Sequence, residues 1–138
     1  MPYPKNYRFT TEHEWVAAPA HGRARIGITD YAQHALGDIV FVELPAVGAR
    51  LEAGQPLGTV ESVKAVSEVF APVSGAVTAV NPELGQHPEF VNQDPHGQGW
   101  MIELQLDQPS PAFETLMDAA RYQAFIAEEE TGAAPGKD

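Results

Sequence analysis

Cysteine is absent from this sequence of 138 residues. Without a thiol the chain can form no disulfide, offers no thiolate to a metal ion and has no cysteine nucleophile. Any sulfur redox chemistry must therefore come from an attached group. Basic residues are also scarce, because 8 lysines and arginines stand against 19 aspartates and glutamates, which gives a formal net charge of −11.

The excess of acidic residues limits the kinds of partner that the protein can bind. Nucleic acids and anionic lipid surfaces are bound through cationic side chains, so we expect neither as a partner. Excess negative charge favours solubility, a monomeric state and docking onto basic patches of other proteins. No apolar run has the length of a membrane span, and residues 1–9 lack the apolar core of a signal peptide. A cytoplasmic protein of bacterial type, without a targeting segment, follows most simply.

The length and the residue pattern predict one mainly β domain. We expect it to cover residues 1–130, and we expect residues 131–138 to form a disordered tail because they are small and polar. Short segments rich in β-branched residues alternate with Gly/Pro turns, while helical patterns are confined to a short insertion and the C-terminal region. The pattern predicts a flattened antiparallel β-barrel or sandwich with a short helical insertion and a C-terminal helix.

The helical insertion is predicted at residues 30–36. Asp30 is placed to cap it, Gln33 to complete a capping box with Asp30, and Gly37 to end it. The following segment, 38–44, has apolar residues in both phases of the strand alternation. It is therefore predicted to be a strand that is buried on both faces.

The sequence also predicts the local structure of three other segments. Residues 1–10 contain two prolines and are expected to be a partly ordered lead-in. Residues 81–99 contain three prolines and are expected to form a long loop, of the kind that often carries function. From Ser110 onward, apolar residues recur at helical spacing, which predicts one helix with a break near Asp118, or two short helices. This apolar stripe consists of Phe113, Leu116, Met117, Ala120 and Ala124, and is extended by Tyr122, Phe125 and Ile126.

One lysine is displayed differently from the others. The chain has three lysines, Lys5, Lys64 and Lys137, and only Lys64 lies far from both ends. The segments 59–63 and 66–70 on either side of it are rich in β-branched residues, which favours two strands joined by a turn. Lys64 is therefore predicted at or beside the tip of a hairpin, where its side chain points into water. An ordinary solvated surface lysine is the plain alternative.

No catalytic or metal-binding motif is visible elsewhere in the sequence. The five histidines are scattered, and none forms the i, i+4 pair beside a carboxylate that indicates zinc. No serine lies in a Gly-x-Ser-x-Gly setting, and the glycines form no phosphate-binding pattern. We therefore expect neither a metal site nor a self-contained catalytic site.

A resemblance to a known family begins at the lysine. The segment Glu61-Ser62-Val63-Lys64-Ala65 resembles the lipoylation site of the glycine cleavage system H proteins. Further blocks match that family in order and spacing, and the resemblance runs over about residues 7–130, nearly the whole chain. These blocks are residues 13–16, 27–33, 36–45, 71–75 and 99–101.

The resemblance implies a specific fold and a specific modification. The fold would be a barrel-sandwich hybrid like that of lipoyl and biotinyl domains, with lipoate joined covalently to Lys64. An attaching enzyme, either a lipoate ligase or a lipoyl or octanoyl transferase, would recognise the hairpin through Glu61, Ser62, Val63 and Ala65.

The resemblance also implies three carboxylates that hold the loaded arm. In the family, the arm that carries an aminomethyl group folds back into a cleft beside the histidine-glutamate-tryptophan block and just after the lysine. Transferred residue by residue, this cleft would be lined by Glu14, Glu12 and Glu68. A carboxylate there would hold the alkylammonium end of the arm.

The implied function is that of a carrier rather than an enzyme, within glycine catabolism. A pyridoxal-phosphate glycine decarboxylase would pass an aminomethyl group to the lipoyl arm, and a tetrahydrofolate-dependent aminomethyltransferase would remove it. The flavoenzyme dihydrolipoyl dehydrogenase would then take up the electrons. These three enzymes and the attaching enzyme are the partners that the resemblance implies.

Other functions differ from this one in the residues around the lysine or in leaving the lysine unmodified. Biotin sites have methionines on both sides of the lysine, whereas Val63 and Ala65 stand here, and lipoyl domains of 2-oxo acid dehydrogenases have aspartate before it. A lipoate-relay or sulfur-metabolism H-like protein would share the hairpin and stays open. An acidic interaction module with an unmodified lysine, or a hydrolase that uses Glu14 with His13, would leave the chain without an acyl group.

Three aromatic positions complete the expectations. Trp15 and Trp100 are expected to be core residues rather than ligand contacts. The sequence departs from the family pattern at His96, where a tyrosine is common. This position lies within the long loop predicted at 81–99.

Overall fold

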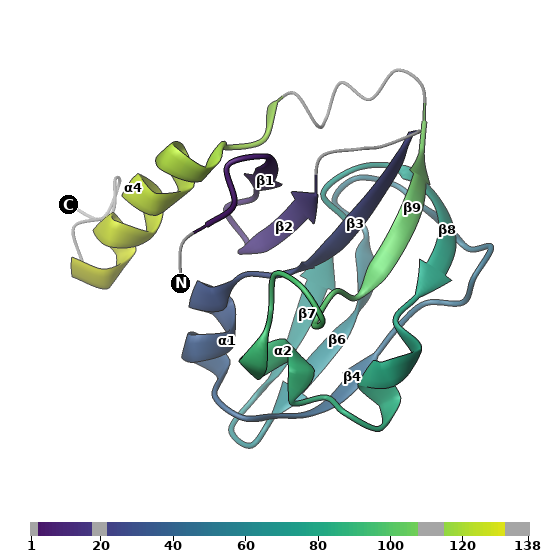
Figure 1. Cartoon of the computed structure of the whole chain (residues 1–138), viewed down its shortest axis with the longest axis horizontal. Helices are drawn as coiled ribbons and strands as arrows, with labels where there is room; N and C mark the ends of the chain where they lie inside the picture. The colour runs from purple at the N-terminus through teal and green to yellow at the C-terminus, as the bar shows by residue number, and fades with distance from the viewer. Residues whose placement is uncertain (1–2, 18–21, 108–114, 132–138) are drawn as a thin grey trace.

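The computed structural model describes residues 3–17, 22–107 and 115–131 (Figure 1). In chain order the strands are β1 (Tyr7–Phe9), β2 (Glu14–Ala17), β3 (Arg23–Ile28), β4 (Ile39–Glu43), β5 (Arg50–Leu51), β6 (Pro56–Ser62), β7 (Val66–Phe70), β8 (Gly75–Val80) and β9 (Ile102–Leu106). The helices are α1 (Asp30–Leu36), the 3-10 helix η1 (Pro82–Gly85), α2 (Phe90–Gln93) and α4 (Ala119–Thr131).

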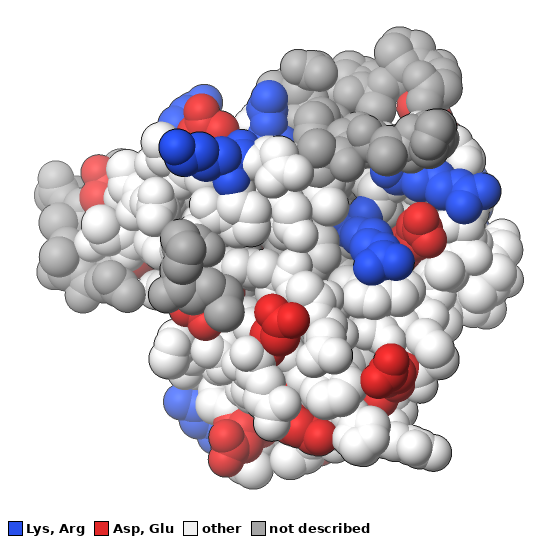
Figure 2. All heavy atoms as spheres, viewed as in Figure 1, with Lys and Arg blue, Asp and Glu red and all other residues white. Residues whose placement is uncertain are grey.

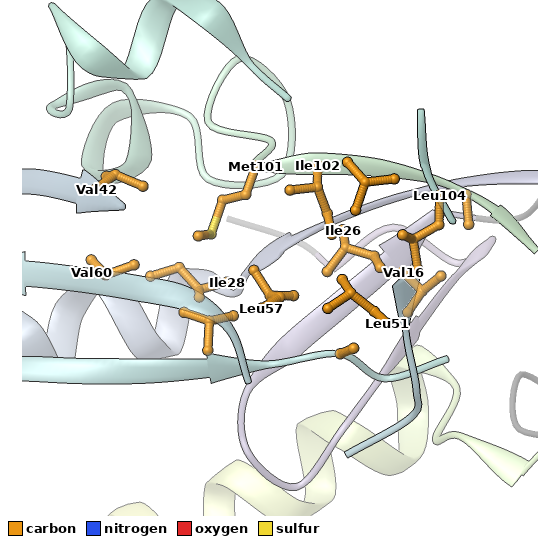
Figure 3. Close-up of a cluster of buried hydrophobic side chains, with 14 of the residues drawn as sticks. Val16, Ile26, Ile28, Val42, Leu51, Leu57, Val60, Met101, Ile102 and Leu104 are labelled. Carbon is orange, nitrogen blue, oxygen red and sulfur yellow. The ribbon is translucent and has the colours of Figure 1, made fainter. Parts of the chain in front are cut away.

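The strands form two antiparallel sheets. One has six strands in the order β1-β2-β3-β9-β8-β5, and the other has three in the order β4-β6-β7. Their inner faces share one apolar core, in which Val42 and Val60 of the smaller sheet lie near Ile28 and Met101 (Figure 3). Sheet packing of this kind buries one face of each strand and leaves the other face to solvent. The predicted mainly β, sandwich-like fold with a few helices is confirmed.

The C-terminal helix packs on a second, aromatic cluster. Tyr122 of α4 stacks on Phe9 with 4.8 Å between ring centroids, and Ile126 is buried beside them. The side chain of Asp118 accepts a hydrogen bond from the backbone N–H of Arg121 at 2.8 Å, so α4 begins after Asp118, where the break was predicted, and most of the segment predicted before it lies outside the described residues.

The predicted apolar stripe of this helix is only partly right. Ala120 and Ala124 are exposed, whereas Ala119, Tyr122 and Ile126 face the core. Because α4 begins at Ala119, its buried face follows the helical spacing of these three positions. Ser110 and Phe113 lie outside the described residues.

The short helix α1 forms at the predicted residues with a different cap. Thr29, not Asp30, is the N-cap, because its extended backbone lets its hydroxyl accept a hydrogen bond from the Ala32 N–H at 3.2 Å. Asp30 is the first helical residue and instead accepts a hydrogen bond from the Gln33 side chain at 3.0 Å. Gly37 ends the helix with φ of 84°, as predicted.

The strand β4 is not buried on both faces, so that prediction was wrong. Ile39 and Val42 are buried, whereas Val40 and Phe41 are 50% and 54% exposed. The register with β6 shifts between Ile39 and Phe41, which marks an irregularity of the β-bulge kind. An extra residue reverses the alternation, so two apolar side chains are placed on the outer face.

Two segments hold more regular structure than predicted. The long loop at 81–99 contains η1 and α2, and the Asn81 side chain caps η1 by accepting a hydrogen bond from the Glu83 N–H at 3.1 Å. The lead-in at 1–10 contains β1, which pairs with β2 and joins the larger sheet. Except for Thr131, which ends α4, the tail predicted at 131–138 lies outside the described residues.

Candidate functional site

A tight turn joins β6 to β7 and displays Lys64. The Ser62 N–H donates to the Ala65 carbonyl at 2.7 Å and closes the turn. The Ser62 hydroxyl oxygen also accepts from the N–H groups of Lys64 and Ala65, at 3.2 and 3.1 Å. Ser62 is buried, while Val63, Lys64 and Ala65 are exposed. The hairpin predicted around Lys64 is therefore present, and the Ser62 hydroxyl stabilises its turn through hydrogen bonds.

The turn is also fixed from the side by the segment between α1 and β4. The Val63 N–H donates to the Asp38 carbonyl at 3.0 Å. The stem of Lys64 lies along the backbone of Gly37, where a Cβ would be 3.6 Å from the lysine Cε. Among the described residues, no hydrogen bond or ion pair holds the Lys64 ammonium group, so the turn is ordered while the amine is left available.

Asn92 of α2 holds this neighbouring segment in place. Its side-chain oxygen accepts from the Ile39 N–H at 2.9 Å, and its NH₂ group donates to the Gln33 side chain and to the Gly37 carbonyl, both at 2.9 Å. The three bonds join α1, β4 and the 81–99 segment beside the hairpin. Asn92 was not among the predicted site residues, and its only signal in the sequence is an amide next to Val91 within the 81–99 segment, which was expected to be of a kind that often carries function.

Glu14 lies at the other end of β7, and it is buried. Its exposed fraction is 2%, and its two carboxylate oxygens accept hydrogen bonds from the Thr10 hydroxyl at 2.6 Å and the Phe70 N–H at 3.0 Å. Burial raises the pKa of Glu14, and these two hydrogen bonds oppose the rise. The strand from Val66 to Phe70 spans four residue steps, or about 13 Å, so Glu14 lies well away from the turn.

The other two predicted carboxylates are exposed. Glu12 lies in the loop before β2, where its N–H donates to the Thr10 hydroxyl oxygen at 3.1 Å. Glu68 lies on the outer face of β7, opposite Thr59 of β6. Two surface hollows of about 420 and 300 Å³ are lined by other residues, with Tyr3 bordering both, so they are separate from these carboxylates.

A polar network ties α4 to the start of β2. His13 contacts the Tyr122 hydroxyl at 2.8 Å and Glu129 at 3.2 Å, and the Tyr122 hydroxyl also contacts that of Thr29 at 2.7 Å. Burial raises the pKa of Tyr122 and lowers that of His13, although Glu129 opposes the second shift. His13 is thus bonded to α4, away from the partners of Glu14, and a paired Glu14–His13 hydrolytic site is not supported.

Trp15 and Trp100 lie beside the 81–99 segment, and His96 lies within it. Trp15 is fully buried and its indole N–H donates to the Pro95 carbonyl at 2.9 Å, whereas Trp100 is half-buried with Arg25 over its ring at 4.3 Å. The core role expected for Trp15 is confirmed. His96 is buried, and its Nε2 accepts from the Asp30 N–H at 3.1 Å.

The described residues form neither a metal cluster nor a membrane-spanning helix. Within residues 3–17, 22–107 and 115–131, no three His, Cys, Asp or Glu side chains gather as a metal site would require. No helix in this described part of the chain has the length and apolar character needed to cross a membrane.

The fold and the displayed lysine define a class. An antiparallel β-sandwich with a lysine on a tight, exposed hairpin turn corresponds to the lipoyl- and biotinyl-type domains. Comparison with known proteins identifies the family. The family model described as "Glycine cleavage H-protein" matches residues 7–129.

Individual proteins agree with this match. The glycine cleavage system H protein of Koribacter versatilis is 56% identical over 129 residues, which cover 94% of this chain and 98% of that protein. That of Acidobacterium capsulatum is 54% identical with the same coverage. The crystal structure of the Mycobacterium marinum H protein superimposes with a TM-score of 0.80 at 38% identity, covering 94% and 99% of the two chains. The chain belongs to the glycine cleavage H-protein family.

Proposed function

We propose that this protein is the lipoyl-lysine carrier of the glycine cleavage system, and that Lys64 is its attachment residue. Family membership supports a carrier role in glycine cleavage. The observation that carries the assignment to Lys64 is its place in the turn, exposed and without a partner for its amine among the described residues.

The residues present fit a covalent acyl group on this amine. An amine attacks an activated acyl group as the free base, so the attaching enzyme must reach the amine and remove its proton. The exposed turn allows that access, and the Ser62 hydroxyl holds the backbone of Lys64 and Ala65 in one conformation. Glu61 and Val63 are exposed beside the lysine, where a lipoate ligase or a lipoyl or octanoyl transferase can contact them.

The attached group supplies the chemistry, and the chain supplies its position. Held covalently on Lys64, a lipoyl group would supply a disulfide that can be reduced to a thiol pair as one sulfur takes up an aminomethyl unit from glycine decarboxylase; once the aminomethyltransferase has taken the unit, the thiol pair could be reoxidised by dihydrolipoyl dehydrogenase. The chain itself catalyses none of these steps. A tether on an ordered turn raises the effective concentration of one group in successive active sites.

The same proposal gives Glu12, Glu14 and Glu68 the role of holding the loaded arm. The loaded arm ends in an amine that is cationic near neutral pH, and carboxylates attract it through charge-assisted hydrogen bonds. Glu12 and Glu68 are exposed and can meet the amine directly. Glu14 acts as an acceptor for the arm by exchanging the Thr10 hydroxyl for the amine, since both its oxygens are already bonded.

Intact-mass analysis after incubation with a lipoate ligase, lipoate and ATP tests the attachment site. The wild-type chain is expected to gain one lipoyl group and Lys64→Arg none, because a guanidinium stays protonated and is a poor nucleophile. An unmodified wild-type chain would support the interaction-module alternative, and modification of Lys64→Arg would place the group elsewhere. Co-purification of glycine decarboxylase with the lipoylated protein separates this function from a lipoate relay.

A further inference from the structure

The smaller sheet leaves its outer face uncovered beside Lys64. The strand registers place Phe41, Glu61 and Val66 in one row across β4, β6 and β7, next to the turn. The next row on the same face, two residues further from the turn along each strand, contains Glu43, Thr59 and Glu68. Apolar side chains therefore flank one glutamate next to the lysine, and further carboxylates lie behind them.

Exposed apolar residues are concentrated on this side of the molecule. The described chain has five large hydrophobic residues that are exposed, and four of them belong to β4, the turn or β7. We call these four the apolar band; they are Val40, Phe41, Val63 and Val66, with 50%, 54%, 70% and 64% of their surface exposed. Single exposed hydrophobic residues need no explanation, but a cluster of them marks an interaction surface.

The charges around the band restrict what can cover it. Glu43, Glu61 and Glu68 are all exposed, and the strands β4, β6 and β7 contain no lysine or arginine. The complementary surface has an apolar pocket surrounded by basic side chains. A second copy of this chain would instead bring the same three carboxylates against these ones, because a two-fold contact uses the same patch on both subunits.

We propose that the apolar band is the docking surface for the enzyme that acylates Lys64, with Phe41 as its anchor; this rests on the function proposed above. The active site of that enzyme must enclose the lysine amine, so its surface extends over the neighbouring row of the same sheet. Partly exposed aromatic residues that insert into a partner pocket contribute most to the affinity of such interfaces. Glu43, Glu61 and Glu68 would meet basic side chains around the pocket.

The expected effect is on binding rather than on the chemical step. Phe41→Ser removes the anchor but leaves Lys64 and the hydrogen bonds of Ser62 intact. Because Phe41 is exposed, the folded state should be retained, and its melting temperature confirms this. The KM for attachment should rise at least about tenfold with kcat little changed.

The test measures lipoyl attachment to the intact protein by a purified lipoate ligase with lipoate and ATP. Val47→Ser is the matched control, because Val47 is 61% exposed but follows β4 at the end away from the turn. The proposal predicts a raised KM for Phe41→Ser and an unchanged KM for Val47→Ser. A second readout is the dissociation constant between the ligase and each variant that also carries Lys64→Arg, which should rise by the same factor.

The outcomes separate this inference from the proposed function. If the wild-type chain is lipoylated and Phe41→Ser has the same KM and dissociation constant as wild type, the docking surface is wrong and the carrier function stands. If the wild-type chain gains no lipoyl group, the carrier function itself fails and the inference fails with it. If wild type sediments as a dimer and Phe41→Ser as a monomer with unchanged KM, the band belongs to a second copy, which also overturns the proposal.

Discussion

Glu14 has one structural role and, under the carrier proposal, one functional role. It satisfies a hydroxyl and a backbone N–H in a buried place that joins β2 to the end of β7. Under the carrier proposal it also attracts the amine of the loaded arm. Such a residue contributes to stability in every state of the protein, and to holding the arm only when the arm is loaded.

The variant Glu14→Ala tests the structural role and the arm-holding role by separate measurements. The variant leaves the Phe70 N–H and the Thr10 hydroxyl without their acceptor, which should cost about 1–3 kcal/mol of unfolding free energy. Lipoyl attachment should be unchanged, because it occurs at the other end of β7. The lifetime of the loaded form, measured by mass spectrometry well below the melting temperature, should fall.

Thr10→Val is the matched control for that experiment. It removes the hydroxyl that donates to the Glu14 carboxylate and that accepts the N–H groups of Glu12 and Glu14, but it keeps the carboxylate, so it should lower stability and preserve the lifetime of the loaded form. If Glu14→Ala only loses stability, or if Thr10→Val shortens the lifetime equally, Glu14 is structural and does not hold the arm.

His96 gives the fold a dependence on pH. Its Nε2 accepts the first N–H of α1, from Asp30, and protonation would remove that acceptor. Burial lowers the pKa of His96 from the ordinary 6.5, against the opposing charges of Asp30 and Asp94. The neutral form therefore contributes stability that is fully present above pH 6.5 and is lost as pH falls through the lowered pKa.

His96→Gln should reduce this dependence, because an amide oxygen can accept the same N–H and does not titrate. We expect the melting temperature of the wild type to fall more steeply than that of His96→Gln as pH drops from about 6.5. Parallel curves for wild type and His96→Gln would assign the pH dependence to other groups, such as His13, whose pKa burial also lowers.

Among the elements, α2 is linked to the hairpin by hydrogen bonds through the segment that lies beside the turn. Asn92 bonds to Ile39 and Gly37, and the Asp38 carbonyl between them accepts the N–H of Val63 in the turn. The chain of contacts runs from the 81–99 segment through the start of β4 to the residue before Lys64.

Asn92→Ala should weaken this chain of hydrogen bonds. The loss of three hydrogen bonds should lower the unfolding free energy by about 1–3 kcal/mol. The amide protons of Ile39 and Val63 should also exchange faster than in wild type, which hydrogen exchange with NMR detects. Gln93→Ala changes an exposed neighbour in the same helix and should alter neither quantity; unchanged exchange in Asn92→Ala would mean that α2 does not support the turn.

The elements also show what could be predicted from the sequence. The hairpin around Lys64 and the helix α1 follow from local signals, namely β-branched runs, turn residues and the glycine at 37. The phase change in β4 depends on its register with β6, and the bonds of Asn92 reach residues 53 to 59 positions away. Neither is written in a short window of sequence, so the exposure of Phe41 and the hydrogen bonds of Asn92 were not predicted, although the hairpin around Lys64 was.

For the whole molecule, the uneven distribution of charge matters most. On the face shown in Figure 2, lysine and arginine side chains gather over α4, β1 and the β3–β9 region, while the lower half carries mainly acidic side chains. The three strands of the smaller sheet contain no basic residue at all. A partner that approaches Lys64 therefore meets a negative field despite the positive charge of the lysine itself.

This field should accelerate association with basic partners. Raising the ionic strength above 0.15 M shortens the screening length below about 8 Å, so the association rate with the attaching enzyme should fall steeply while dissociation changes little. Stopped-flow measurements of the Lys64→Arg protein with the ligase give both rates without turnover. An association rate that does not depend on salt would rule out electrostatic steering.

The central claim, that Lys64 carries the group through which the carbon of glycine passes, can be tested in one measurement. Lipoylated protein is incubated with glycine decarboxylase and glycine labelled at its methylene carbon, and the label on the intact protein is measured by mass spectrometry. Wild type should acquire one labelled aminomethyl unit, and Lys64→Arg after the same lipoylation treatment should acquire none. A lipoylated wild-type protein that stays unlabelled, or a labelled Lys64→Arg protein, would contradict the account.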